Sequence, residues 1–184
     1  MKHLFYPDAT AKSSYDIPYE ELYKLGYRGV VYDIDNTLVP HGAPADQRAI
    51  EHFKRLRDIG FDTVLISNNK ESRVKSFADA VGSRYVYRAN KPAKRGYLKA
   101  MELMNTNDTN TFFVGDQLFT DVWGAKRVGI KSYLVDQIDK KEEIQIVIKR
   151  RFEWIVLFFY KRYIKRNGCN WPKLGGEALE RKGW

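Results

Sequence analysis

Short apolar runs alternate with helical segments along most of this 184-residue chain. The runs GVVYDI at residues 29–34 and FDTVLISNN at residues 61–69 are rich in β-branched and aromatic residues, which is typical of buried strands. Between them, residues 44–60 carry apolar side chains at helical spacing and end on a glycine, which predicts an amphipathic helix. Repeated alternation of strand and helix predicts a parallel sheet with helices on both faces. We therefore expect an α/β fold, a Rossmann-like three-layer sandwich with a mainly parallel central sheet.

The rest of the chain extends this alternation. The N-terminal arm DIPYEELYKLG predicts a short helix, with Asp16 as its cap and Pro18 in its first turn. We divide the chain into a core with this helical arm at residues 1–140, a basic and aromatic helix at residues 141–166, and a Gly-rich tail at residues 167–184, for which disorder is one alternative. Further strands are expected at residues 84–89, 111–116 and 130–136, and further helices at residues 71–82, 93–104 and 120–129.

Composition narrows the classes of partner and compartment. The formal net charge of +9 favours an anionic partner: a phosphorylated metabolite, a membrane surface or nucleic acid. Cys169 is the single cysteine, so an intramolecular disulfide is impossible and a reducing interior is the default. The first residues lack the apolar core of a secretory signal, and no apolar run approaches the ~20 residues that span a bilayer. We expect a cytoplasmic protein, with peripheral contact with the inner face of a membrane as an alternative.

Polar side chains occur where the predicted strands end. In a parallel sheet the carboxyl ends of the strands meet at one edge, where ligands bind. Side chains at these ends should therefore form one site, although four separate segments contribute them. The candidates are Asp33, Asp35, Ser67, Lys91, Asp116 and Asp121.

This set of groups suits phosphate chemistry with a metal ion. Asp33, Asp35 and Asp116 would repel one another in a single crevice unless a cation lay among them. Oxygen ligands favour Mg²⁺, and the absence of His and Cys from these segments argues against zinc. Ser67 and Lys91 would bracket a phosphoryl group. A carboxylate can also attack phosphorus, and a second one two residues further on could transfer the proton.

The same residues resemble the motifs of a known family. DIDNT at residues 33–37 resembles the DxDxT motif of the haloacid dehalogenase-like superfamily, and Ser67 resembles its second motif. Lys91, within NKP, is similar to the third, and GDQLFTD at residues 115–121 is similar to the fourth, GDxxxTD. The four motifs occur in order and cover residues 29–135. The stretch DIPYEELYKLGYRGVVYDIDNTL also resembles subfamily IIIA, the branch that includes phosphatidylglycerophosphate phosphatases.

The resemblance implies a role for each residue. Asp33 would be the nucleophile and a metal ligand. Asp35 would be the general acid/base, which is typical of phosphatases in this superfamily, and would bind Mg²⁺ through its backbone carbonyl. Asp116 would complete the metal site, with Asp121 supporting it. The phosphate would be held by Ser67, Lys91 and the neighbouring Asn68.

The spacing of the motifs leaves no room for a cap domain. Thr37 to Ser67 accommodates one helix and its loops, and Ser67 to Lys91 accommodates one helix and one strand. A capless site is open to solvent and would accept a large or surface-bound substrate. Ser67 has a second interpretation, as the cap of the helix that follows it.

The segment KKEEIQIVIKRRFEWIVLFFYKRYIKRNG predicts a basic and aromatic helix. It could pack on the sheet, dock on an anionic membrane through its basic flanks and aromatic side chains, or form an oligomer contact. At 100° per residue, its expected apolar face comprises Ile148, Phe152, Ile155, Val156, Phe159 and Tyr163.

We therefore expect a Mg²⁺-dependent phosphomonoester hydrolase that forms an aspartyl-phosphate, with phosphatidylglycerophosphate as the suggested substrate. A soluble sugar phosphate, a nucleotide phosphate or a phosphoprotein are alternative substrates. A nucleic-acid-binding or scaffold protein on the same fold is an alternative of another class. The charge favours it, but we identify no nucleic-acid recognition motif, and Asp33 and Asp35 are both present.

Overall fold

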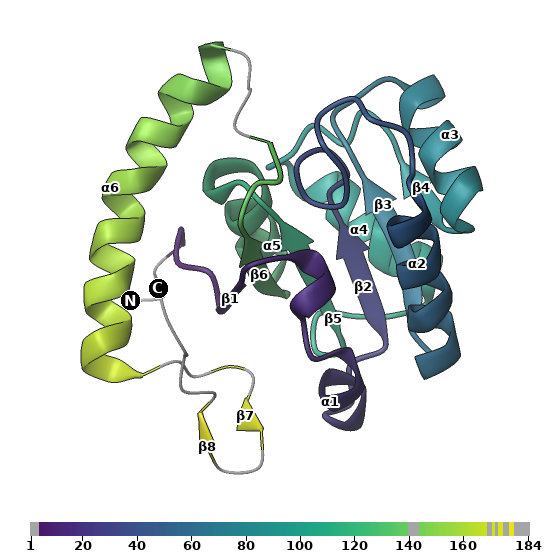
Figure 1. Ribbon diagram of the computed structural model, residues 1–184. Helices are drawn as coiled ribbons and strands as arrows, with labels where there is room; N and C mark the ends of the chain where they lie inside the picture. The colour runs from purple at the N-terminus through teal and green to yellow at the C-terminus, as the bar shows by residue number, and fades with distance from the viewer. Residues whose placement is uncertain (1–3, 140–143, 169–170, 172, 175–176, 179–184) are drawn as a thin grey trace.

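A parallel six-stranded sheet forms the centre of the protein (Figure 1). The computed structural model describes residues 4–139, 144–168, 171, 173–174 and 177–178. The strand order is β1-β6-β5-β2-β3-β4, and every neighbouring pair is parallel. The expected α/β fold with a parallel central sheet is thus confirmed. The strands are β1 (Ala9–Ala11), β2 (Gly29–Tyr32), β3 (Asp62–Ile66), β4 (Arg84–Val86), β5 (Thr111–Gly115) and β6 (Lys131–Val135).

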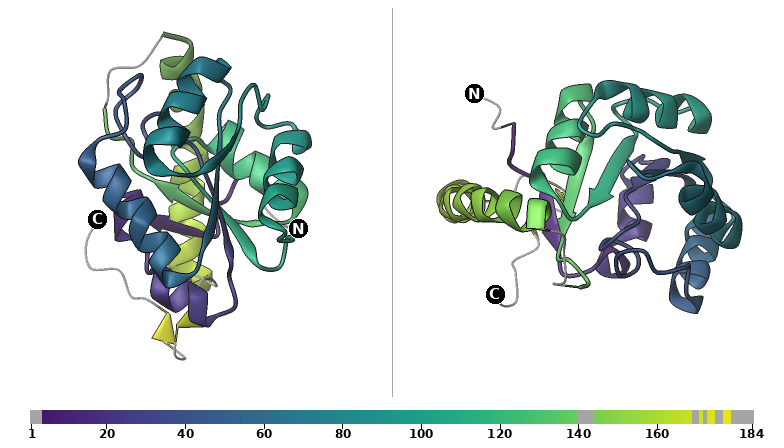
Figure 2. Two further views of the ribbon diagram at one scale, coloured as in Figure 1. Left: turned by 90° about the vertical axis from the view of Figure 1, so that its right-hand side faces the viewer. Right: turned by 90° about the horizontal axis from the view of Figure 1, so that it is seen from above.

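Helices cover both faces of this sheet (Figure 2). One face packs against α1 (Tyr19–Lys24), α2 (Gln47–Ile59) and α3 (Glu71–Val81). The other packs against α4 (Lys94–Met104) and α5 (Trp123–Val128). Successive strand residues point to opposite faces, and all four residues of β2 are buried, which explains its continuous apolar sequence. The remaining elements are the short helices η1 (Ser14–Asp16) and η2 (Leu118–Val122), the long helix α6 (Ile144–Asn167), and the strand pair β7 (Lys173–Leu174) and β8 (Glu177–Ala178).

The connections leave the carboxyl edge of the sheet open. Residues 33–46 form the loop from β2 to α2, and α3 alone links β3 to β4. Both connections lie in a fully described stretch, and neither contains a folded cap. The structure therefore has no cap domain at either of the two positions where the motif spacing left no room for one.

The N-terminal arm differs from the expectation. Asp16 does not cap the helix, because it lies inside η1, where the Ser13 side chain accepts from the Tyr15 N–H. Helix α1 begins at Tyr19, and Pro18 precedes it without a side-chain cap. Strand β1 was not expected from the sequence, because its three residues lack the apolar run of the other strands.

Helix α6 lies along the side of the molecule, next to η2 (Figure 1). The buried Glu153 carboxylate accepts the backbone N–H groups of Leu118 at 2.7 Å and Phe119 at 3.3 Å. Val156 and Leu157 pack on the apolar cluster beside η2. The helix therefore packs on the core, which was one of the alternatives. Its expected apolar face is wrong in part: Val156 of that face packs on the core, and the Ile148 side chain lies outside the described residues. Phe152, Ile155 and Phe159 of that face are exposed.

Across the described residues, no helix is both long enough and apolar enough to traverse a bilayer. The assignment of residues 167–184 as a tail falls mostly outside the described residues, and the domain boundaries stay predictions.

Candidate active site

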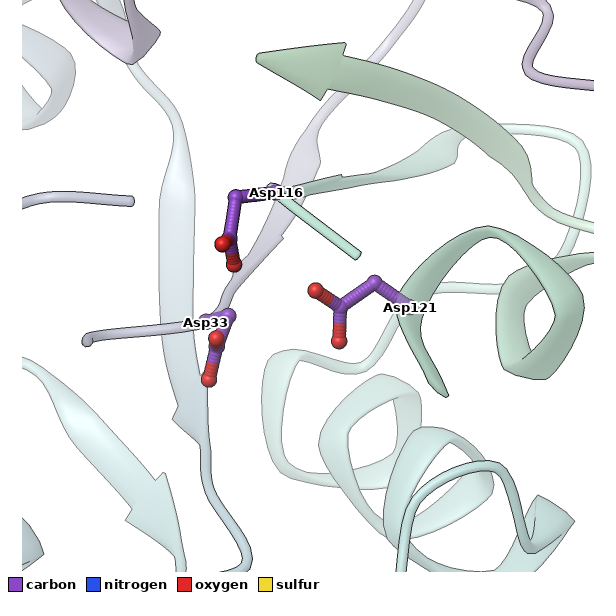
Figure 3. A group of neighbouring side chains, drawn as sticks. All are labelled: Asp33, Asp116 and Asp121. Carbon is purple, nitrogen blue, oxygen red and sulfur yellow. The ribbon is translucent and has the colours of Figure 1, made fainter. Parts of the chain in front are cut away.

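Three buried carboxylates meet at the carboxyl edge of the sheet (Figure 3). Asp33 follows β2, and its N–H donates to the Val114 carbonyl at 3.0 Å, which continues the ladder between β2 and β5. Asp116 follows β5, and Asp121 lies in η2. Oxygen atoms of the three carboxylates all lie within 4.8 Å of one another. Strand β5 lies beside β2 in the sheet. This brings Asp33 next to Asp116 and Asp121, which follow it by more than 80 residues in the sequence.

Local backbone geometry fixes the third acid. A Cβ atom on Gly115 would lie 2.4 Å from Asp121 Oδ2, so only glycine allows the carboxylate to approach β5 this closely. The Gln117 N–H donates to the same oxygen at 3.1 Å. The Tyr97 hydroxyl donates to the Thr120 carbonyl at 2.8 Å and so supports the backbone of η2 next to Asp121. Glycine at the start of the GDxxxTD motif is therefore a steric requirement of this site.

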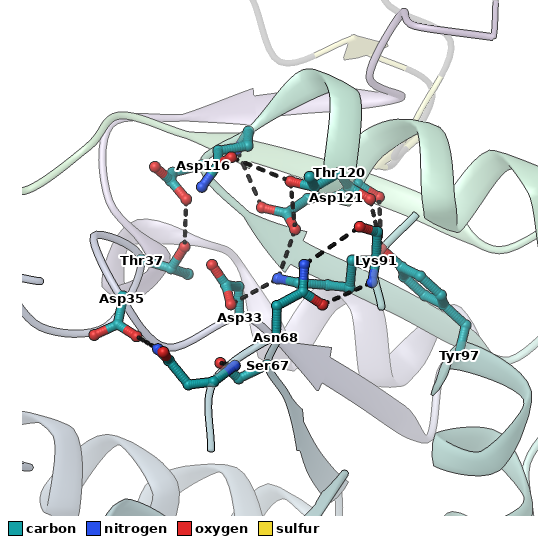
Figure 4. A network of polar contacts seen from close by, with 12 residues as sticks. Asp33, Asp35, Thr37, Ser67, Asn68, Lys91, Tyr97, Asp116, Thr120 and Asp121 are labelled. Carbon is teal, nitrogen blue, oxygen red and sulfur yellow. Dashed lines mark hydrogen bonds and ion pairs between the residues drawn. The ribbon is translucent and has the colours of Figure 1, made fainter. Parts of the chain in front are cut away.

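Lys91 is the buried cation among these acids (Figure 4). Its Nζ lies 2.7 Å from Asp33 Oδ1 and 2.8 Å from Asp121 Oδ1. The Asn68 side chain holds the lysine backbone from both sides: its Oδ1 accepts the Lys91 N–H at 2.7 Å and its Nδ2 donates to the Lys91 carbonyl at 3.3 Å. Asn68 therefore positions Lys91, while its proposed phosphate contact stays a prediction.

The cluster carries more negative charge than Lys91 neutralises. Burial raises the pKa of the Asp33 carboxyl to about 8; Lys91 opposes this rise, and Asp121 and Asp116 add to it. Burial alone would lower the pKa of Lys91, but Asp121 and Asp33 outweigh it and raise that pKa above its ordinary value. A further cation in this crevice would relieve the repulsion among the carboxylates.

The Asp35 carboxylate lies outside this cluster (Figure 4). Its Oδ1 accepts the Gly42 N–H at 2.8 Å and lies 3.0 Å from Arg73 Nη2. Its Oδ2 accepts from Asn69 Nδ2 at 2.7 Å. The structure thus separates the two acids of the DIDNT motif: Asp33 faces the buried cluster and Asp35 faces α3.

The other sequence candidates lie around the same edge. Ser67 is buried, and its Oγ accepts the Asn69 N–H at 3.1 Å, within the loop that follows β3. It is not the cap of α3, whose preceding residue is Lys70. Thr37 Oγ1 donates to Asp116 Oδ1 at 3.3 Å. Arg73 was not among the residues expected at the site. It lies within an amphipathic helix, where solvated charges are common, so its position in the sequence carried no signal.

The donor set fits a hard divalent cation. Asp33, Asp116 and Asp121 offer only oxygen atoms, which Mg²⁺ prefers, and neither His nor Cys belongs to the group. The structure places the Asp121 carboxylate in the cluster, and its expected role in supporting the metal stays a prediction. Asp35 was expected to bind the metal through its backbone carbonyl. That role is compatible with the observed side chain, which contacts Asn69 and Arg73 instead of the cluster.

Sequence comparisons identify the family. A model of the haloacid dehalogenase-like hydrolases matches residues 45–129. A Bacillus subtilis (strain 168) protein named "Probable phosphatase YqeG" is 33% identical over 163 residues, which cover 88% of this chain and 95% of that protein. The chain belongs to the haloacid dehalogenase-like hydrolase family. The expected family and type of enzyme, a phosphatase of this family, are confirmed, and the roles of individual haloacid dehalogenase-motif residues stay predictions.

Further relatives of this family agree with that assignment. Phosphatidylglycerophosphate phosphatase 1, chloroplastic/mitochondrial, of Arabidopsis thaliana is 29% identical over 174 residues, and the chain spans about half of its length (48%). A Vibrio cholerae structure described as a 3-deoxy-D-manno-octulosonate 8-phosphate phosphatase matches with a TM-score of 0.52 at 15% identity, over 70% of this chain and 78% of that one. A HAD superfamily (subfamily III A) hydrolase from Legionella pneumophila matches with a TM-score of 0.51 at 17% identity, over 66% and 72%. These two structures show the shared fold.

Proposed function

We propose that the protein is a Mg²⁺-dependent phosphomonoester hydrolase that forms an aspartyl-phosphate on Asp33. The observation that carries the proposal is the buried group of Asp33, Asp116 and Asp121 with Lys91 between two of its members. Asp33 and Asp116, with Asp121 beside them and the Asp35 carbonyl, would hold Mg²⁺. The ion would neutralise charge on the phosphoryl oxygens.

The reaction divides into two displacements. An Asp33 carboxylate oxygen attacks phosphorus, and the bond from phosphorus to the leaving alcohol oxygen breaks while Asp35 gives that oxygen a proton. Water then attacks the phosphorus, Asp35 takes its proton, and the bond to Asp33 breaks to release phosphate. Lys91 and Ser67 bind phosphoryl oxygens, and the Asn68 contacts with the Lys91 backbone keep the ammonium in place.

A phosphate-release panel with Mg²⁺ tests this proposal. We expect wild type to release phosphate from at least one phosphomonoester, lipid phosphates included. Asp33→Asn should lower release by about 10³-fold or more, because an amide is a poor nucleophile. The variant should remain folded in thermal unfolding, since Asn is nearly isosteric and removes a charge that burial disfavours. Undiminished release by Asp33→Asn would show that another group attacks phosphorus.

The proposed substrate is a lipid phosphate, phosphatidylglycerophosphate. The name of the Arabidopsis relative supports it, and so does the open edge of the sheet. The surface of α6 adds a third argument. Trp154 and Leu157 share a hollow of about 230 Å³ with Asp116, so this helix borders the acid cluster. A sugar phosphate, a nucleotide phosphate or a phosphoprotein would need none of these apolar side chains.

Helix α6 also has the surface of a membrane-docking helix. Phe152 is 60% exposed, Trp154 69% and Phe159 56%, so each could enter the interface of a bilayer. Each basic side chain near an anionic surface adds about 1 kcal/mol. From these charges we propose that the protein binds the cytoplasmic face of an anionic membrane. Over residues 151–167, where the side chains of the helix are described, the exposed basic residues are Arg151, Lys161, Arg162, Lys165 and Arg166.

A further inference from the structure

Arg73 reaches from α3 to the proposed acid/base. Its Nη2 lies 3.0 Å from Asp35 Oδ1, in a contact where the side chains are 21% and 12% exposed. The guanidinium carbon lies 5.6 Å from the centre of the Phe77 ring, one turn further along the same helix. Phe77 is itself buried, so the arginine rests on a fixed surface. Arg73 therefore occupies a defined position at the rim of the site.

The contact with Asp35 does not use the whole guanidinium. Arginine carries five N–H donors in a planar fork that suits phosphate and carboxylate groups. Arg73 Nε is buried, and in the described part of the chain it has no hydrogen-bond partner. Such an unsatisfied buried donor is ordinarily destabilising, because it has lost its hydrogen bonds to water without a replacement. Asp35, in contrast, already accepts from Asn69 and the Gly42 backbone.

The position of Arg73 indicates which part of a substrate it would meet. If Asp35 is the acid/base of the proposed function, its carboxyl must touch the oxygen of the leaving alcohol. A group that contacts Asp35 from the rim then lies beside that alcohol and away from the transferred phosphoryl group.

We propose that Arg73 binds a second anionic group, carried by the leaving alcohol of the substrate. The inference rests on the proposed function and narrows its substrate class to phosphomonoesters whose alcohol bears a phosphodiester or a second phosphate. Arg73 Nε has no hydrogen-bond partner among the described residues, and a guanidinium fork has the geometry for a phosphate oxygen pair. A substrate without a second anion would leave this donor unsatisfied and would bind less tightly.

Steady-state kinetics on purified full-length protein test the inference. The substrates are short-chain phosphatidylglycerophosphate below its micelle concentration, a soluble sugar bisphosphate, and p-nitrophenyl phosphate, whose leaving group has no anion. For Arg73→Gln we expect kcat/KM on at least one doubly anionic substrate to fall about 10- to 100-fold further than on p-nitrophenyl phosphate, mainly through KM. Whichever doubly anionic substrate shows this loss identifies a lipid or a metabolite source.

Two further variants complete the test. Lys75→Gln removes the same charge from an exposed position of α3 and should leave the substrate ratio unchanged. Arg73→Lys keeps the charge without the fork and should show a smaller loss in the same direction, which covers the case that Arg73→Gln fails to fold.

Three outcomes are distinguishable. An equal loss on all substrates, confined to kcat, would assign Arg73 to the positioning of Asp35 and overturn the inference. Turnover of p-nitrophenyl phosphate alone would also overturn it, while the proposed hydrolase would stand. Absence of any Mg²⁺-dependent turnover in wild type would overturn the proposed function itself.

Discussion

At the scale of single residues, a buried hydrogen-bond chain lies beneath the strand that carries Asp33. The Tyr32 hydroxyl donates to the Tyr19 hydroxyl at 2.6 Å, and Tyr19 donates to the Ser14 carbonyl at 2.6 Å. Since both hydroxyl hydrogens are used, His52 Nε2, 3.1 Å from the Tyr32 oxygen, must be the donor. The pKa of His52 is lowered to about 4, mainly by burial and in smaller part by the charges of Arg55 and Arg48. His52 is therefore a neutral core residue at neutral pH.

This histidine should make stability depend on pH. Its pKa is lower in the folded state than the ordinary 6.5, so the unfolded chain binds more protons below that pH. The stabilisation is present above pH 6.5 and is lost as pH falls toward 4, by roughly 3 kcal/mol in all. Urea unfolding at pH 7.5 and 4.5 measures it. His52→Gln, which keeps a donor but does not titrate, should lose less on acidification than wild type. Equal losses in both proteins would contradict this account.

At the scale of elements, burial decides what the sequence could predict. β2 and β5 were predictable because both of their faces are buried, which demands continuous apolar sequence. β1 was not, because Asp8 helps to hold it beside β6: its carboxylate accepts the Ser132 N–H at 3.0 Å. Asp33 and Asp116 were predictable from the strand ends, because each directly follows a strand. Asp121 lies further on, in η2. The contact of Arg73 with Asp35 was not predictable, because it depends on how α3 packs.

The face of α6 shows the limit of periodicity. Hydropathy assigns Glu153 to the exterior, but its carboxylate binds two backbone N–H groups at the start of η2 and turns the helix. Phe152 and Phe159 thereby become exposed (60% and 56%). Phe158, which was not part of the expected apolar face, is 46% exposed, and its ring stacks on that of Trp154 with centroids 6.1 Å apart. The rings of Trp154 and Phe158 form an exposed apolar surface, and contact with water does not stabilise such a surface.

The aromatic pair predicts membrane binding that point variants can measure. In liposome flotation, we expect wild type to float with vesicles that contain phosphatidylglycerol and less with neutral phosphatidylcholine vesicles. The double variant Trp154→Ala/Phe158→Ala should float several-fold less, because about 1.5–3 kcal/mol of apolar burial is lost per side chain. Leu98→Ala, at an exposed apolar position of α4, is the matched control and should float as wild type does. Equal flotation of all three proteins would remove α6 as the docking surface.

At the scale of the whole molecule, charge is divided between the surface and the site. The chain carries a formal +9, yet its described buried edge concentrates Asp33, Asp116 and Asp121 around one lysine. The parallel topology causes this concentration of acids, because neighbouring strands end at the same edge and the acids that follow them must lie close together. A basic exterior attracts an anionic substrate or surface, while the acidic crevice attracts a cation. Substrate and cation can therefore approach the same edge for opposite electrostatic reasons.

This arrangement predicts that Mg²⁺ stabilises the fold and that the effect requires the Asp116 carboxylate. A ligand at about 100 times its Kd adds about 2.7 kcal/mol, which for this chain length raises Tm by about 5–10 °C. Asp116→Asn should lose that rise. In EDTA it should melt above wild type, because one of the buried charges that raise the pKa of Asp33 is gone. Asp79→Asn, exposed on α3, is the control and should keep the full Mg²⁺ effect. If Mg²⁺ still raised the Tm of Asp116→Asn, the metal site could not lie at this edge of the sheet.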